Sequence, residues 1–333
     1  MRAGRLVSYF LLGLVARHAV AQETGKYVSL SKACFEFNEK ITVQMESGGF
    51  KAAEAALSEV LAGKENGLGP SCDWMLLNNM GAVMSASGRI AEAENMAARS
   101  VAILEKICAP DDRVMLRPLQ VLGSAQYELG KISKARESLR RMQLIRSDRP
   151  IDRAIVRGLA AALFQTEGRS QEAEREYLLA VTAWEEAGMG QSANIVAVLQ
   201  MLGSLYLSTG RLEEAGRMLR RAGDVLDACR DAAPMDRINL LNQLSVLHVR
   251  QGDFQKAEGE LRTALAMVDV DTQPDPVRMV ALLTNYGYVL RKNHRSREAR
   301  AAEARAAALA STGSAGRVID ASELFAESKK GRK

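Results

Sequence analysis

The residues best suited to chemistry in this chain are few and scattered. Of its three histidines, only His248 and His294 lie beyond residue 21, and neither has a cysteine or an acidic cluster beside it. Metal sites and nucleophilic catalysis need such groups at fixed spacing, and no HExxH, CxxC, GxSxG, Walker or GxGxxG context occurs. We therefore expect no enzyme activity, with no catalytic, cofactor-binding or metal-binding residues.

The charge pattern predicts a solvated surface rather than a nucleic-acid interface. The formal net charge is +5, and it falls to +2 without the three arginines of the first 21 residues. Acidic residues such as Glu172, Glu213 and Glu214 follow shortly after a glycine, where the start of a helix favours negative charge. A basic run occurs in the tail at 329–333, and such ends are usually frayed. We expect no nucleic-acid partner.

The first 21 residues have the three parts of a secretory signal peptide. Basic residues precede an apolar run from Leu6 to Ala16, and a small–x–small triplet ends at Ala21. An apolar helix of that length would span roughly 16 Å, about half of a bilayer core. We predict cleavage after Ala21, export to the periplasm or the outside of the cell, and no stable membrane anchor.

The remaining chain repeats itself about every 42 residues. Each copy has an anchor residue, normally glycine, followed five positions later by alanine. The anchors are Gly48, Gly88, Gly130, Gly168, Gly210, Gly252 and, in the last copy, His294. Seven copies occupy roughly residues 30–311, and an internal period of this size indicates a solenoid of stacked units.

Each repeat is predicted to be a pair of amphipathic helices joined by a turn at the anchor. Apolar and small residues recur at spacings of four and seven before and after the anchor, which places them on one helical face. Glycine suits the turn because it accepts a positive φ. A second small residue, seven before the anchor, lets the paired helices approach closely. Pro118 lies out of phase and predicts a late start or a kink in its helix.

This pattern resembles the tetratricopeptide repeat, in the long 42-residue form of kinesin light chains. The matching stretches include LLNNMGAVMSASGRIAEAE and VLQMLGSLYLSTGRLEEAG. The resemblance implies an all-α fold, a right-handed α-solenoid of antiparallel helix pairs whose first helices line a concave face. It says little about function, because such solenoids present partners rather than perform chemistry.

The four cysteines allow one disulfide in an exported protein. Cys34 and Cys72 lie near the starts of the first helices of repeats one and two, and neighbouring first helices run alongside each other. Cys108 lies near the end of the second helix of repeat two, where an antiparallel pair would bring it close to Cys72. We expect Cys72 to pair with Cys34 or with Cys108, and Cys229 to stay free.

In the resembling family, the fifth position of each first helix faces the concave surface. Here that position is polar in six repeats, and the thirteenth position adds two basic residues near the C-terminal end. A polar ladder flanked by apolar positions suits an extended peptide, although the same amides could simply be solvated. The candidate groove residues are Asn38, Asn78, Gln120, Gln200, Asn242, Thr284, Arg250 and Lys292.

Together these patterns divide the chain into a signal peptide at 1–21, a repeat solenoid at 22–311, and a capping segment with a basic tail at 312–333. The favoured function is an exported, non-catalytic scaffold that binds an unidentified protein or peptide in its groove. The alternative is a self-associating structural or assembly factor of the cell envelope. The sequence leaves the oligomeric state open.

Overall fold

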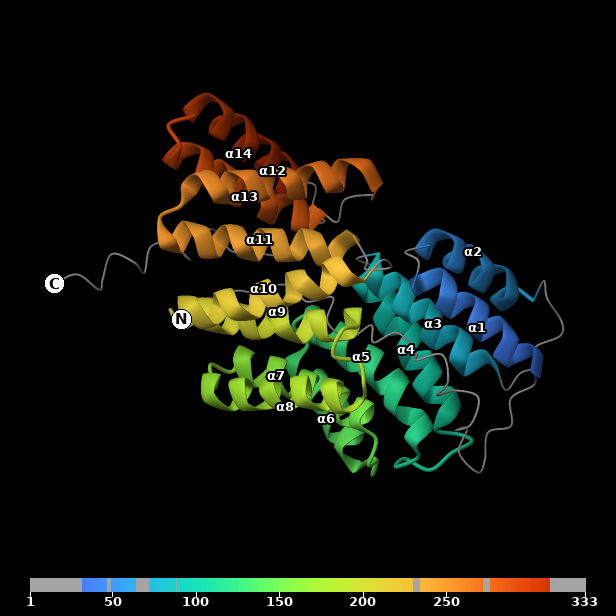
Figure 1. The fold of residues 1–333 in the computed structure, drawn as a ribbon. Helices are drawn as coiled ribbons and strands as arrows, with labels where there is room; N and C mark the ends of the chain where they lie inside the picture. Colours follow the sequence, from blue (N-terminus) through green and yellow to red (C-terminus); the bar gives the residue numbers. More distant parts are fainter. Residues whose placement is uncertain are drawn as a thin grey trace. The chain divides into compact units, whose positions relative to one another are not determined.

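A computed structural model describes residues 32–46, 49–63, 72–87, 89–229, 234–271 and 276–311 (Figure 1). The predicted signal peptide with its cleavage site at Ala21, and the segment 312–333, lie outside these ranges. The described residues are all-α, with fourteen α-helices that form the antiparallel pairs of an α-solenoid. None of the described helices is long and apolar enough to cross a membrane.

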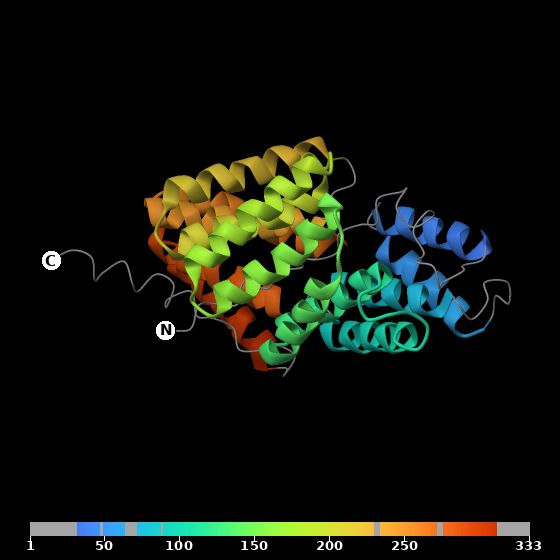
Figure 2. The ribbon, with the colours of Figure 1, turned by 90° about the horizontal axis from the view of Figure 1, so that it is seen from below.

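The described residues form two compact units, one from 32 to 198 with Cys229 and the other from 199 to 228 and 234 to 311. The division falls within α9 (Ala193–Ser208). The first unit contains α1 (Lys32–Glu46), α2 (Phe50–Leu61), α3 (Asp73–Ala86), α4 (Ile90–Leu104), η2 (Arg113–Met115), α5 (Leu116–Glu128), α6 (Ile132–Leu144), α7 (Pro150–Thr166) and α8 (Ser170–Glu186). The second contains α10 (Leu212–Ala228), α11 (Pro234–Gln251), α12 (Phe254–Asp271), α13 (Pro276–Lys292) and α14 (Ser296–Ser311). Paired helices such as α7 and α8 lie side by side in both views (Figure 1 and Figure 2).

The predicted anchor turns adopt one recurring conformation. Gly130, Gly168, Gly210 and Gly252 have φ between 70° and 84°. The residue after each anchor donates its N–H to a carbonyl five positions back, as Lys131 does to Gln126 at 2.8 Å. This is the Schellman termination, which requires a left-handed residue. In the last repeat His294 takes that conformation with a φ of 62°, so the turn persists where the glycine is lost.

Small residues set the distance between paired helices, as the register predicted. The alanine five positions after each anchor has no exposed surface in any of the seven repeats. A Cβ added at Gly81 would lie 3.3 Å from the carbonyl oxygen of Ala93, and one at Gly203 would lie 2.8 Å from Cδ2 of Leu219. The helix backbones can therefore approach this closely only because a side chain is missing or minimal. Pro118 marks a late start: the short 3₁₀ turn η2 precedes α5, which begins at Leu116.

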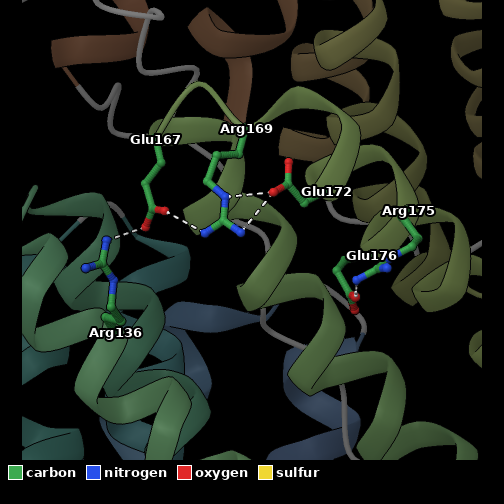
Figure 3. A network of polar contacts seen from close by, with 6 residues as sticks. All are labelled: Arg136, Glu167, Arg169, Glu172, Arg175 and Glu176. Carbon is green, nitrogen blue, oxygen red and sulfur yellow. Dashed lines mark hydrogen bonds and ion pairs between the residues drawn. The ribbon is translucent and has the colours of Figure 1, made fainter.

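Ion pairs link the turns of successive repeats along the surface. Arg89, directly after an anchor, lies 2.6 Å from Glu54 of the preceding repeat, and Lys131 and Arg295 pair in the same way with Glu94 and Glu258. In one pair of repeats both of these positions are arginine, Arg136 and Arg169, and Glu167 lies between them. Figure 3 shows Glu167 contacting both Arg136 of α6 and Arg169 at the α7–α8 turn. Arg169 also contacts Glu172.

Candidate partner-binding face

The eight predicted groove residues fall on the first helices of their repeats, but they are not equally accessible. Asn38, Asn78, Gln120 and Gln200 are each exposed by 9% or less. Asn242, Thr284 and Arg250 are partly buried, and Lys292 is exposed. The fifth-position side chains therefore differ in accessibility from one repeat to the next. The predicted side chains are partly accessible in α11 and α13 and buried in the earlier helices.

Several of the buried amides are committed to neighbouring repeats. Asn79 Nδ2 donates to Asn38 Oδ1 at 2.7 Å, and Asn285 Nδ2 donates to Asn242 Oδ1 at 2.8 Å. Gln200 Nε2 donates to the backbone carbonyl of Asp236 at 2.8 Å. A buried amide without a partner is costly, so these bonds stabilise the contact between consecutive first helices. These amides join repeats, which the fifth-position pattern alone does not reveal because their partners lie at the sixth position or on the backbone.

Gln120 contacts one member of a partly buried cluster of charged side chains. Its Oε1 accepts from Arg117 at 3.1 Å, and the nearby carboxylate of Asp152 accepts from Arg113 and, at 2.7 Å, from Ser147. Burial alone would raise the pKa of Asp152, but the hydrogen bonds from Arg113 and Ser147 outweigh it and lower the pKa. Burial lowers the pKa of Arg117 to about 10, which leaves the guanidinium charged at neutral pH. Asp152 lies in the first turn of α7, where an acid is common, so its place in the sequence does not indicate this role.

Four of the predicted groove residues, Asn242, Arg250, Thr284 and Lys292, occupy one face of α11 and α13. Repeat positions are counted so that Asn242 of α11 and Thr284 of α13 are the fifth. At positions two, five, nine and thirteen the residues are at least partly exposed: Asn239, Asn242, Val246 and Arg250 in α11, and Ala281, Thr284, Tyr288 and Lys292 in α13. We call these eight residues the α11–α13 face. Lys292 Nζ lies 5.8 Å and 5.6 Å from the ring centroids of Phe254 and Tyr288, which holds this cation against aromatic surface. The Thr284 hydroxyl donates to the carbonyl of Val280 at 2.7 Å.

The structure joins Cys34 to Cys72 in a disulfide, with the two Cα atoms 6.0 Å apart. Both residues have no exposed surface. Of the two partners left open for Cys72, Cys108 is a free thiol whose pKa burial and the nearby Asp112 raise to about 11. The Cys108 thiol is therefore protonated at neutral pH. Cys229 is not part of a disulfide, and its Sγ–H donates to the carbonyl oxygen of Gln191 at 3.1 Å.

The two histidines lie in different settings. His248 Nδ1 lies 3.0 Å from Glu260 Oε2 between α11 and α12, and burial raises the pKa of Glu260 despite that contact. His294 serves as an anchor of the repeat turn. Within the described ranges, no three histidine, cysteine or acidic side chains come together in a way that could hold a metal ion.

The segment 131–157 is strongly basic, which the net charge of the whole chain does not reveal. It holds nine lysines and arginines against three acids. The fold neutralises much of it with glutamates from adjacent helices: Arg141 lies 2.8 Å from Glu105, and Arg157 lies 2.7 Å from Glu176. Lys131, Arg136 and Arg153 are paired similarly. The local excess of positive charge in the sequence is thus largely balanced on the folded surface.

Comparisons with known proteins agree with this architecture. Models of the tetratricopeptide repeat match residues 72–142, 152–228 and 243–315, about two thirds of the chain. The comparison with curated proteins finds no match. The first repeat, α1 and α2, lies outside the matched ranges and is a helix pair like the others.

Solved structures of low sequence identity share the fold. A Rap protein complexed with competence and sporulation factor has a TM-score of 0.62 at 12% identity, over 84% of this chain and 75% of that one. The Cut9–Hcn1 hetero-tetramer of the APC/C gives 0.59 at 19% identity, over 83% and 46%. BtubC from P. vanneervenii gives 0.54 at 22% identity, over 69% and 94%. With the family models matched across both units and the repeat turns in register, the chain belongs to the tetratricopeptide repeat family.

Proposed function

We propose that this protein is an exported, non-catalytic scaffold that binds a protein or peptide partner on its α11–α13 face. Export rests on the signal-peptide pattern of residues 1–21. The absence of catalysis rests on the family, whose repeats generally serve as scaffolds. Two of the structural neighbours are complexes, the Rap protein with competence and sporulation factor and the Cut9–Hcn1 hetero-tetramer.

One observation carries the choice of face. In α11 and α13, the second, fifth and thirteenth repeat positions, at which the register predicted a concave surface, are all at least partly exposed. They combine amide and hydroxyl groups with apolar side chains and end in Arg250 and Lys292. Such a surface offers hydrogen bonds to a peptide backbone, shallow apolar contact, and attraction for an acidic group near the C-terminal end of α11 and α13.

Capture from the envelope and secreted proteins of the native host tests the proposal. The tagged mature protein is compared with a variant that carries Arg250→Glu and Lys292→Glu. We expect the wild type to retain one or a few proteins that this variant loses. Arg262→Glu is the matched control for charge reversal, because Arg262 is exposed on the second helix α12. Failure to capture any protein, or equal capture by both variants, would contradict the proposal for this face.

A further inference from the structure

We propose that two copies of this protein dimerise through α8, which packs antiparallel against its counterpart about a two-fold axis near Leu178 and Leu179. The inference goes beyond the proposed function, because it assigns a second surface, in the first unit, and a different partner, a second copy of this chain. Dimerisation through α8 and partner binding on the α11–α13 face can each fail without the other.

The outer face of α8 carries an apolar pair where the other repeats carry charge. Leu178 and Leu179 are exposed by 44% and 38%. They lie ten and eleven positions after the anchor Gly168, and at these two positions every other repeat has at least one charged side chain. The equivalent pairs are Ser58–Glu59, Ala98–Arg99, Arg140–Arg141, Arg220–Arg221, Arg262–Thr263 and Ala304–Arg305. The fold therefore does not need leucine here, whereas covering the pair with another apolar surface would be favourable.

The exposed side chains of α8 form one stripe with the spacing of a coiled coil. Five of them follow one another at intervals of four, three, four and three residues: Gln171, Arg175, Leu178, Thr182 and Glu185. Such intervals keep side chains on the seam along which two helices pack. The leucine pair lies at the centre of this stripe, so another helix packed along α8 would bury both leucines.

The charges of the stripe select a second, antiparallel copy of α8. Arg175 precedes the leucine pair and Glu186 follows it, and their side chains are exposed by 70% and 50%. About a two-fold axis between the two leucines, Arg175 lies within about one helical turn of Glu186 of the second copy, at both ends of the contact. A parallel arrangement would instead place like charges against each other.

The dimer should be weak, because the contact is small and its charges have other contacts. Arg175 lies 3.5 Å from Glu176 of its own chain (Figure 3), and Glu186 lies 2.5 Å from Arg153. The 17 residues of α8 span about 26 Å. One helix from each copy should bury less than the roughly 800 Å² per partner of a standard interface. We expect a dissociation constant on the order of 10–100 μM.

Sedimentation equilibrium of the mature protein over a range of concentrations tests this inference. The wild type should be in equilibrium between monomer and dimer. A variant with Leu178→Arg and Leu179→Arg adopts the arginine pair that α6 carries at these positions, so it should fold normally and dimerise about tenfold or more weakly. Ile107→Arg is the matched control, because Ile107 is 41% exposed in the same unit but lies after α4, and it should leave dimerisation unchanged.

Exchanged charges test the antiparallel orientation. Arg175→Glu and Glu186→Arg each bring like charges together across the contact, so each variant alone should dimerise more weakly than the wild type. An equimolar mixture of the two variants should form a heterodimer, because opposite charges then meet at both ends. A wild type that stays monomeric about tenfold above the expected dissociation constant would overturn the inference. So would a dimer that the double leucine variant leaves intact, or a mixture that associates no better than its components.

Discussion

Opening the Cys34–Cys72 disulfide should destabilise the first unit by a predictable amount. The two cysteines are 38 residues apart in sequence. The loop-entropy relation gives about 4 kcal/mol for a closed loop of that length. Packing of Ile41 and Leu57 and the hydrogen bond between Asn79 and Asn38 remain after reduction, so the fold should persist at lower stability. At a typical urea dependence, 4 kcal/mol corresponds to a midpoint lower by about 2 M.

Tryptophan fluorescence can isolate this effect. The chain has two tryptophans, and Trp74 lies two residues after Cys72 in a buried position. In a Trp184→Phe background, urea unfolding with and without reductant should show the full shift. A variant with both Cys34→Ala and Cys72→Ala should match the reduced protein and should not respond to reductant.

Equal midpoints for the oxidised and reduced protein would refute the loop-entropy reasoning. The pairing itself is checked by peptide mapping without reduction. A linked peptide that contains Cys72 and Cys108 would contradict the geometry at α1 and α3.

The other predictions concern the repeat turns, the helix contacts and the buried charge. Gly259→Ala should raise the free energy of unfolding by about 0.5–1 kcal/mol, because nothing lies within 4 Å of an added Cβ. Gly203→Ala should lower the free energy of unfolding by on the order of 1–2 kcal/mol, because an added Cβ would lie 2.8 Å from Leu219. Urea midpoints that move in the same direction in both variants would contradict this contrast. His294→Gly should raise stability by about 1 kcal/mol because it relieves a left-handed side chain, and an unchanged melting temperature would count against that explanation. Asp152→Asn should cost about 1–3 kcal/mol through its lost contacts with Arg113. Folding lowers the pKa of Asp152, so its ionised carboxylate contributes fully to stability above its ordinary pKa of about 4. That contribution is lost as the pH falls through the lower pKa of the folded protein. Urea midpoints measured across this pH range should therefore fall less in Asp152→Asn than in the wild type.

The sequence by itself determined the repeat and its turns, because those features are local. A Schellman turn needs one residue with positive φ, and the anchor glycines mark it within a few positions of each helix end. Close helix contact needs small residues at fixed spacing, and Gly81 and Ala93 show that requirement directly. Because the pattern repeats, the turn could be predicted even where one copy departs from it, as at His294.

The interaction partners of the polar side chains and of Cys72 were decided by the tertiary structure. The fifth-position amides looked alike in sequence, yet Asn38 is bonded to Asn79, while Asn78 keeps an unpaired acceptor. The basic stretch at 131–157 is balanced by glutamates from adjacent helices, and the choice between two partners for Cys72 depended on which Cα came within disulfide reach. In these cases the partner lies between 19 and 41 residues away along the chain. Hydrogen bonds, ion pairs and disulfides depend on distances of a few ångströms across neighbouring helices, and a repeat period does not specify those distances.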